Sequence, residues 1–145
     1  MKNGKLQVGI IGCGGIANQK HLPALKNQAD KADMVAFLNR HYEFMHSANI
    51  EIIATGTTGK HAQAAGLKVE RLLSGPLGGD AQIAAQVAEH KVQMVLFFRD
   101  PLGKHPHEPD VQMLMRVCDV HNVPLATNPA SAELMLKGFE KQMQK

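Results

Sequence analysis

The chain has 145 residues, the length of a single domain that can enclose its own hydrophobic core. Hydrophobic residues make up 44% of it and charged residues 20%, a composition that excludes collagen, coiled coils and intrinsic disorder. The net charge of +3 is spread along the chain without a basic run, so it favours a small anionic ligand over nucleic acid.

The sequence does not predict membrane insertion or export. Its longest strongly apolar run, Met94 to Phe98, is far shorter than a membrane-spanning helix. The N-terminal region lacks the pattern of an export signal, and two cysteines, Cys13 and Cys118, do not form a disulfide framework. We therefore expect a cytoplasmic protein.

Short apolar runs alternate with helical patterns, which is typical of βα units and predicts a three-layer α/β/α fold around a parallel sheet. The five predicted strands are Leu6 to Ile11, Ile50 to Thr55, Val69 to Leu73, Val92 to Phe98 and Pro124 to Thr127. Neither an internal repeat nor a linker divides the chain, so residues 1–145 are predicted to form one domain.

The first predicted strand runs into Gly12-Cys13-Gly14-Gly15-Ile16-Ala17, a G-x-G-x-x-A pattern. Gly12, Gly14 and Gly15 would allow a tight turn and the close approach of a phosphate at the start of a helix. A dinucleotide site also needs an acidic residue at the end of the second strand, but that strand ends at Thr55 and Gly56. A structural turn that holds at most a small anion is therefore favoured over a nicotinamide site.

The segment from Ile16 to Ser47 is longer than one crossover helix, and two consecutive helices are predicted there. The alternative is that Met34 to Phe37 forms an extra strand. Further along the chain, three apolar stripes at helical spacing predict the core faces of covering helices. These are Ile83, Ala84, Val87 and Ala88; Val111, Leu114, Met115 and Cys118; and Leu134, Met135 and Phe139.

Two motifs follow predicted strands at the edge where parallel sheets bind ligands. In Ala54-Thr55-Gly56-Thr57-Thr58-Gly59, hydroxyl and backbone N–H donors could hold a phosphate, or Thr57 or Thr58 could simply cap a helix. In Ser74-Gly75-Pro76-Leu77-Gly78-Gly79-Asp80, the aspartate lies near a helix start. It is either a helix cap or a residue of a ligand site.

A third motif combines Arg99-Asp100-Pro101 with His105-Pro106-His107-Glu108-Pro109-Asp110. Asp110 could cap the following helix, and His107 could be a solvated loop histidine. The sequence does not predict a metal site, because the spacing of a His pair or a Cys ligand set is absent.

Together these motifs, with Leu102, Val111 and Leu125-Ala126-Thr127-Asn128, resemble the methylglyoxal synthase family from about Asp30 to the C-terminus. The resemblance implies a parallel sheet of order 3-2-1-4-5 and the conversion of dihydroxyacetone phosphate to methylglyoxal and phosphate. It also implies a homohexamer that uses neither cofactor nor metal.

The resemblance assigns roles to individual residues. Asp80 would be the base that removes a proton next to the substrate carbonyl, His107 would polarise that carbonyl and move protons between oxygens, and Asp110 would orient the histidine. The substrate phosphate would be held by Thr55, Thr57, Thr58, Ser74 and Gly75.

The N-terminus departs from that family, whose first strand ends in a His-Asp pair followed by a Lys. Here Val8 to Ala17 and Lys20 to Leu25 resemble the first βα unit of the glucose-fructose oxidoreductase and inositol dehydrogenase family. We interpret residues 1–30 and 31–145 as parts of an engineered chimera with a seam between Ala29 and Met34. Its activity is expected to be impaired, and the alternative is a chimeric scaffold without catalysis that keeps a vestigial phosphate or nucleotide loop.

Overall fold

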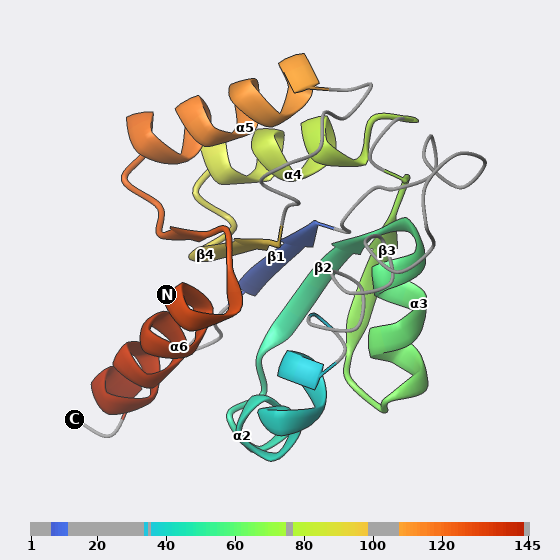
Figure 1. Ribbon diagram of the computed structural model, residues 1–145, viewed down its shortest axis with the longest axis vertical. Helices are drawn as coiled ribbons and strands as arrows, with labels where there is room; N and C mark the ends of the chain where they lie inside the picture. Colours follow the sequence, from blue (N-terminus) through green and yellow to red (C-terminus); the bar gives the residue numbers. More distant parts are fainter. Residues whose placement is uncertain (1–6, 12–33, 35, 75–76, 99–107, 144–145) are drawn as a thin grey trace.

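The computed structural model describes residues 7–11, 34, 36–74, 77–98 and 108–143 (Figure 1). Five strands in these ranges form one parallel sheet in the order β3-β2-β1-β4-β5. They are β1 (Gln7–Ile11), β2 (Glu51–Thr55), β3 (Val69–Leu72), β4 (Met94–Phe97) and β5 (Leu125–Ala126). The predicted strands, their direction and their order are confirmed, with each boundary within two residues of its predicted position.

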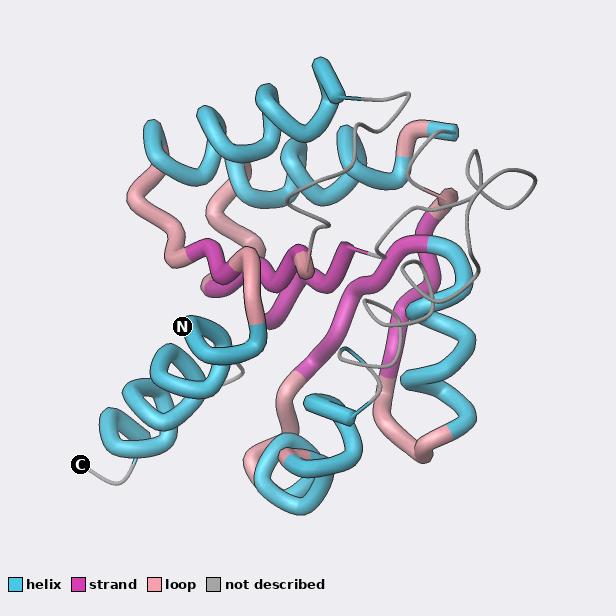
Figure 2. The backbone as a smooth tube through the Cα atoms, viewed as in Figure 1, coloured by secondary structure: helices cyan, strands magenta, loops and turns pink. Residues whose placement is uncertain are grey.

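Helices cover both faces of the sheet (Figures 1 and 2). One face carries α2 (Tyr42–Ser47), α3 (Gly56–Ala64) and α6 (Pro129–Met143). The other carries α4 (Gly79–Ala88) and α5 (Glu108–Val120), which pack side by side. The predicted three-layer α/β/α architecture is thereby confirmed.

The chain before α2 is helical at residue 34 and over residues 36–40. The alternative of an extra strand at Met34 to Phe37 is therefore wrong. Met34, Phe37 and Leu38 are buried, as is Met45 in α2, and all four side chains belong to the hydrophobic core on this face of the sheet.

Alternation along the central strands divides the interior into two hydrophobic cores. In β2, Ile52 and Ala54 face α2, α3 and α6, whereas Ile53 faces α4 and α5. The same alternation continues in β4. Both faces of these strands are covered, which explains why they appear in the sequence as continuous apolar runs.

A glycine in the central strand, Gly9, lies where α4 packs closely on the sheet. A Cβ at Gly9 would lie 3.1 Å from Cγ2 of Ile83 and 3.5 Å from Cγ1 of Val92. Glycine at this position therefore lets α4 approach β1 closely, and the approach fixes the depth at which α4 lies on the sheet.

The prediction is wrong for two residues of the core faces, which are exposed in the structure. Leu134 is 73% exposed, because α6 directs Ala132 and Leu136 into the core and position 134 is two residues out of phase with both. Ala88 is also exposed at the last residue of α4. Met135 and Phe139 pack against the core as predicted.

Several predicted features lie outside the described residues. They include the glycine turn with Gly12, Gly14 and Gly15, as well as Gly75 and His107. In the part of the chain that the structure describes, none of the helices combines the length and apolar character that a membrane span requires.

Candidate functional site

The loops after β2 and β3 lie against each other at the carboxyl edge of the sheet. These strands pair directly, with Thr55 opposite Leu72 at their ends. Gly56 has a φ of +48°, and a Cβ there would lie 3.3 Å from both Cα and Cβ of Ser74. The contact brings the two glycine-containing motifs into one place, as expected for neighbouring parallel strands.

The threonines of the first loop are positioned by the strand-to-helix junction. Thr55 ends β2 and is 2% exposed, and Thr58 lies in the first turn of α3 and is 8% exposed. The N-cap of α3 is Thr55, and its side chain makes no capping hydrogen bond. The alternative in which Thr57 or Thr58 caps this helix is therefore wrong, since both are inside it.

A pair of glycines joins the second loop to α4. Gly78 is the N-cap of that helix and has a φ of +112°, a conformation that residues with a side chain rarely adopt. A Cβ at Gly79 would overlap the carbonyl oxygen of Leu73 and lie 2.7 Å from Cγ2 of Thr55. The start of α4 is thus packed directly onto the ends of β2 and β3.

Asp80 lies at this junction and is completely buried. It is the second residue of α4, whose N-cap is Gly78, so the interpretation of Asp80 as the N-cap is wrong. Its side chain belongs to the first turn of the helix, where the helix dipole favours a negative charge. A carboxylate that is fully removed from solvent is uncommon in proteins, which marks this position as a candidate for chemistry.

The other predicted catalytic residues are only partly placed. Asp110 is the third residue of α5 and is partly exposed, so it lies inside the first turn of that helix. His107 and Gly75 lie outside the described residues, and the side chain of Thr57 is not described. Among the predicted site residues, Thr55 and Ser74 lie against Gly79, the residue that directly precedes Asp80.

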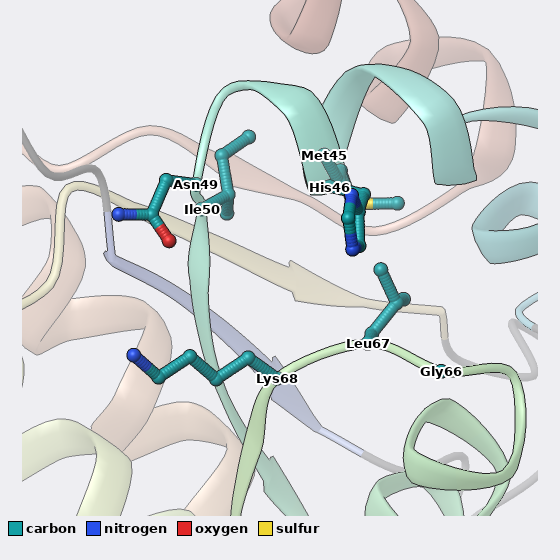
Figure 3. A pocket seen from close by; sticks show the side chains of 7 residues that line it. All are labelled: Met45, His46, Asn49, Ile50, Gly66, Leu67 and Lys68. Carbon is teal, nitrogen blue, oxygen red and sulfur yellow. The ribbon is translucent and has the colours of Figure 1, made fainter.

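Nothing in the described ranges groups three or more potential metal-ligating side chains in one place. A cavity of about 250 Å³ lies at the opposite edge of the sheet, before the starts of β2 and β3 (Figure 3). Its lining includes His46, Asn49 and Lys68, which are all exposed. This cavity is therefore separate from the junction that contains Asp80.

Comparison with known proteins shows the family of the chain. The sequence model of the "MGS-like domain" family matches residues 33–127. A methylglyoxal synthase of Thermus thermophilus is 55% identical over 123 residues, which cover 84% of this chain and 96% of the relative. The chain belongs to the methylglyoxal synthase family. The enzymes of this family are phosphate-eliminating carbon–oxygen lyases.

Two further relatives agree with this assignment. The methylglyoxal synthase of Carboxydothermus hydrogenoformans is 58% identical over 110 residues, covering 75% of this chain and 89% of the relative. The crystal structure of methylglyoxal synthase from Elizabethkingia anophelis NUHP1 has a TM-score of 0.73 and 32% sequence identity. It covers 91% of this chain and 77% of the other chain. The methylglyoxal synthase fold is therefore shown by structure as well as by sequence.

The match with the family is longer than the sequence motifs predicted. A match of 123 residues cannot fit between Asp30 and the C-terminus at Lys145, so it begins before Asp30. The comparisons give no support to a chimera of two families. In the structure, β1 lies at the centre of the sheet, in agreement with the predicted order 3-2-1-4-5.

Two residues that connect the loops of the site were not identified from the sequence. Gly79 has no role of its own in the sequence motif, although a Gly-Gly pair at a helix start is a signal for close backbone packing. Gln82 binds the backbone of Leu73 through its side chain. The sequence carries no local signal for that bond, since it depends on the tertiary packing of α4 against the loop after β3.

Proposed function

We propose that the chain converts dihydroxyacetone phosphate to methylglyoxal and inorganic phosphate at the junction of β2, β3 and α4. The observation that carries this proposal is the complete burial of Asp80 beside the loops of Thr55 and Ser74. A carboxylate next to hydroxyl and backbone donors suits proton abstraction from a small phosphorylated substrate.

The proposed base is Asp80. It takes a proton from the carbon next to the substrate carbonyl, and the electron pair of that C–H bond forms an enediolate. The C–O bond to the phosphate then breaks, and its electron pair leaves with the phosphate. The remaining enol takes up a proton on carbon to become methylglyoxal, so the reaction is an elimination without net oxidation.

The phosphate group is proposed to bind Thr55, Thr57, Thr58, Ser74 and Gly75. The support is the meeting of the two loops at Gly56 and Ser74, together with the burial of Thr55 and Thr58. Hydroxyl groups and the N–H groups at the start of α3 are donors of the kind that bind phosphate.

The family resemblance supplies the roles of two further residues. His107 would polarise the carbonyl as charge develops on its oxygen, and Asp110 would orient the histidine. Preorganised donors of this kind commonly contribute about 3–4 kcal/mol each to transition-state stabilisation. The location of Asp110 in the first turn of α5 follows directly on the segment that contains His107.

We further propose that catalysis is slower, by several orders of magnitude, than in relatives whose first strand ends in a His-Asp pair followed by a Lys. Such polar groups commonly contribute roughly 10²–10³-fold each to the rate. In this chain β1 ends at Ile11 and is followed by Gly12. A scaffold without catalysis is the second candidate, and the family's hexamer stays a prediction that a mass measurement in solution would test.

The direct test is release of methylglyoxal from dihydroxyacetone phosphate by the purified chain. Asp80→Asn keeps the size of the side chain and removes the base, so activity should fall to background. Asp119→Asn, at an exposed aspartate in α5, is the matched control and should keep the full rate. An Asp80→Asn variant as active as this control would overturn the proposal, whereas an inactive unsubstituted chain would favour the scaffold.

A further inference from the structure

A side chain on α4 binds the backbone at the end of β3. The amide N–H of Leu73 donates a hydrogen bond of 2.9 Å to Oε1 of Gln82. Leu73 directly precedes Ser74, and Gln82 lies two residues after Asp80. The bond therefore joins the segment that holds the proposed phosphate ligand to the helical turn that holds the proposed base.

Leu73 is held by α4 on both sides of its backbone. Its carbonyl group lies against Gly79, where a Cβ would overlap the oxygen, and its amide group is bound by Gln82. Asp80 lies between these two contact points in the sequence. The carbonyl of Ser74 also accepts hydrogen bonds of 3.0 Å from the Leu77 amide and 2.9 Å from the Gly79 amide.

We propose that Gln82 is a positioning residue that sets the separation between the carboxylate of Asp80 and the phosphate-binding side of the loop at Ser74. This inference rests on the proposed function, since the distance between Asp80 and Ser74 matters only if both residues act on the substrate. Gln82 acts through the backbone of Leu73 and is not itself a catalytic residue.

The expected effect is on rate more than on stability, because Gln82 is exposed and water can replace its bond to Leu73. Proton abstraction depends more steeply on geometry. A displacement of about 1 Å between a base and its substrate can lower a rate by roughly 10²-fold.

The chain offers a matched control for this bond. Nε2 of Gln63 in α3 donates a hydrogen bond of 3.2 Å to the carbonyl of Val69. Gln63 and Gln82 are both exposed, and each binds the backbone beside or within β3. Gln63 binds at the amino end of that strand, away from Asp80, so its loss changes the same kind of contact without touching the proposed site.

The experiment compares Gln82→Ala, Gln82→Glu and Gln63→Ala by kcat, KM, melting temperature and the isotope effect for substrate deuterated at the carbon that loses the proton. Gln82→Ala should lower kcat by about tenfold or more and keep the isotope effect at least as large as in the unsubstituted chain, since proton abstraction becomes slower. Gln82→Glu keeps an oxygen acceptor and should restore most of kcat. Gln63→Ala should leave kcat and the isotope effect unchanged, with a similar small change in melting temperature.

Equal kinetic behaviour of Gln82→Ala and Gln63→Ala would overturn the inference. A loss of kcat in Gln82→Ala with a smaller isotope effect would also overturn it, because a step other than proton abstraction would then have become slower. If the unsubstituted chain releases no methylglyoxal, the proposed function fails, and amide NMR spectra then test the positioning role of Gln82 separately. The Ser74 and Asp80 amide resonances should shift in Gln82→Ala and stay in place in Gln63→Ala. Unshifted resonances in Gln82→Ala would refute the positioning role.

Discussion

The carbonyl oxygen of Leu73 occupies the space into which a side chain at residue 79 would project. Gly79 is therefore the residue through which α4 contacts the end of β3, and Cγ2 of Thr55 in β2 borders the same space. The ends of β2 and β3 and the start of α4 thus meet at Gly79, because glycine has no side chain to separate them. The position of Asp80, the next residue in α4, depends on this contact.

Gly79→Ala should destabilise the fold and abolish activity. The new methyl group would overlap the Leu73 carbonyl, so α4 has to move away from the sheet. Overpacking of this kind commonly costs about 1–3 kcal/mol of unfolding free energy. Urea unfolding monitored by circular dichroism measures the loss.

Gly138→Ala is the control for that substitution. Gly138 lies in α6, and a Cβ there would meet no atom within 4 Å. Alanine should therefore raise the unfolding free energy by about 0.5–1 kcal/mol, because glycine loses more backbone entropy in a helix. A Gly79→Ala variant as stable as Gly138→Ala would contradict the packing at Leu73.

Thr58→Ala should weaken the binding of inorganic phosphate. Thr58 is 8% exposed in the first turn of α3, and in the proposed site its hydroxyl would add to the N–H donors at the start of the helix. Loss of one hydrogen bond to a charged group commonly costs about 1.5–3 kcal/mol. Isothermal titration with phosphate measures the change, and Ser47→Ala, at an exposed hydroxyl of α2, should bind phosphate like the unsubstituted chain.

The sequence predicted the sheet well because each strand carries its own signal. Ile52 to Ala54 in β2 and Met94 to Phe98 at β4 are continuous apolar runs bounded by polar residues, and burial on both faces is the physical reason for that pattern. Helical spacing likewise predicted the burial of Val87 and Leu114. It failed at Leu134 because this residue lies two positions from both Ala132 and Leu136, which α6 directs into the core.

The candidate site was predictable only in part. Asp80 and the threonines could be identified from motifs, since their residue types and neighbours are local properties of the chain. Whether Asp80 is a cap or a buried carboxylate depends on where the helix begins, and Gly78 decides that through its positive φ. The bond between Gln82 and Leu73 is tertiary and could not be deduced from spacing.

Glu133→Gln should lower the melting temperature at pH 7 but not at strongly acidic pH. Oε2 of Glu133 in α6 lies 3.3 Å from Nε2 of His41 and 3.0 Å from Nη1 of Arg40. The hydrogen bond from His41, the charges of both partners and the hydrogen bond from Arg40 lower the pKa of Glu133, against the opposing effect of burial.

The sign of this pH dependence follows from the lowered pKa. The carboxylate stabilises the fold fully above its ordinary pKa of 4.5, and the stabilisation is lost as the pH falls through the lowered value. The effect should be small, because exposed ion pairs are screened by solvent. Glu140→Gln in the same helix is the control, and a difference between the two variants that persists unchanged at pH 2 would contradict the assignment.

Cys118 should resist thiol reagents in the folded chain. Burial, with a further contribution from the charge of Asp119, raises the pKa of this thiol to about 11, so little thiolate exists at pH 8. In a Cys13→Ser variant, alkylation by iodoacetamide should be slow in native buffer and fast in urea. Equal rates in both conditions would show that Cys118 is accessible.

The central location of β1 also has a consequence for the order of assembly. β1 pairs with β2 on one side and β4 on the other, and the amide of Gln7 binds the side chain of Gln93, 86 residues later in the chain. The pairs β3-β2 and β4-β5 therefore cannot join into one sheet until β1 has paired with both β2 and β4. Bringing β1 and β4 together closes a long loop, and this costs conformational entropy before the strand contacts form. We therefore expect the slow step of folding to be the insertion of β1 between the pairs β3-β2 and β4-β5.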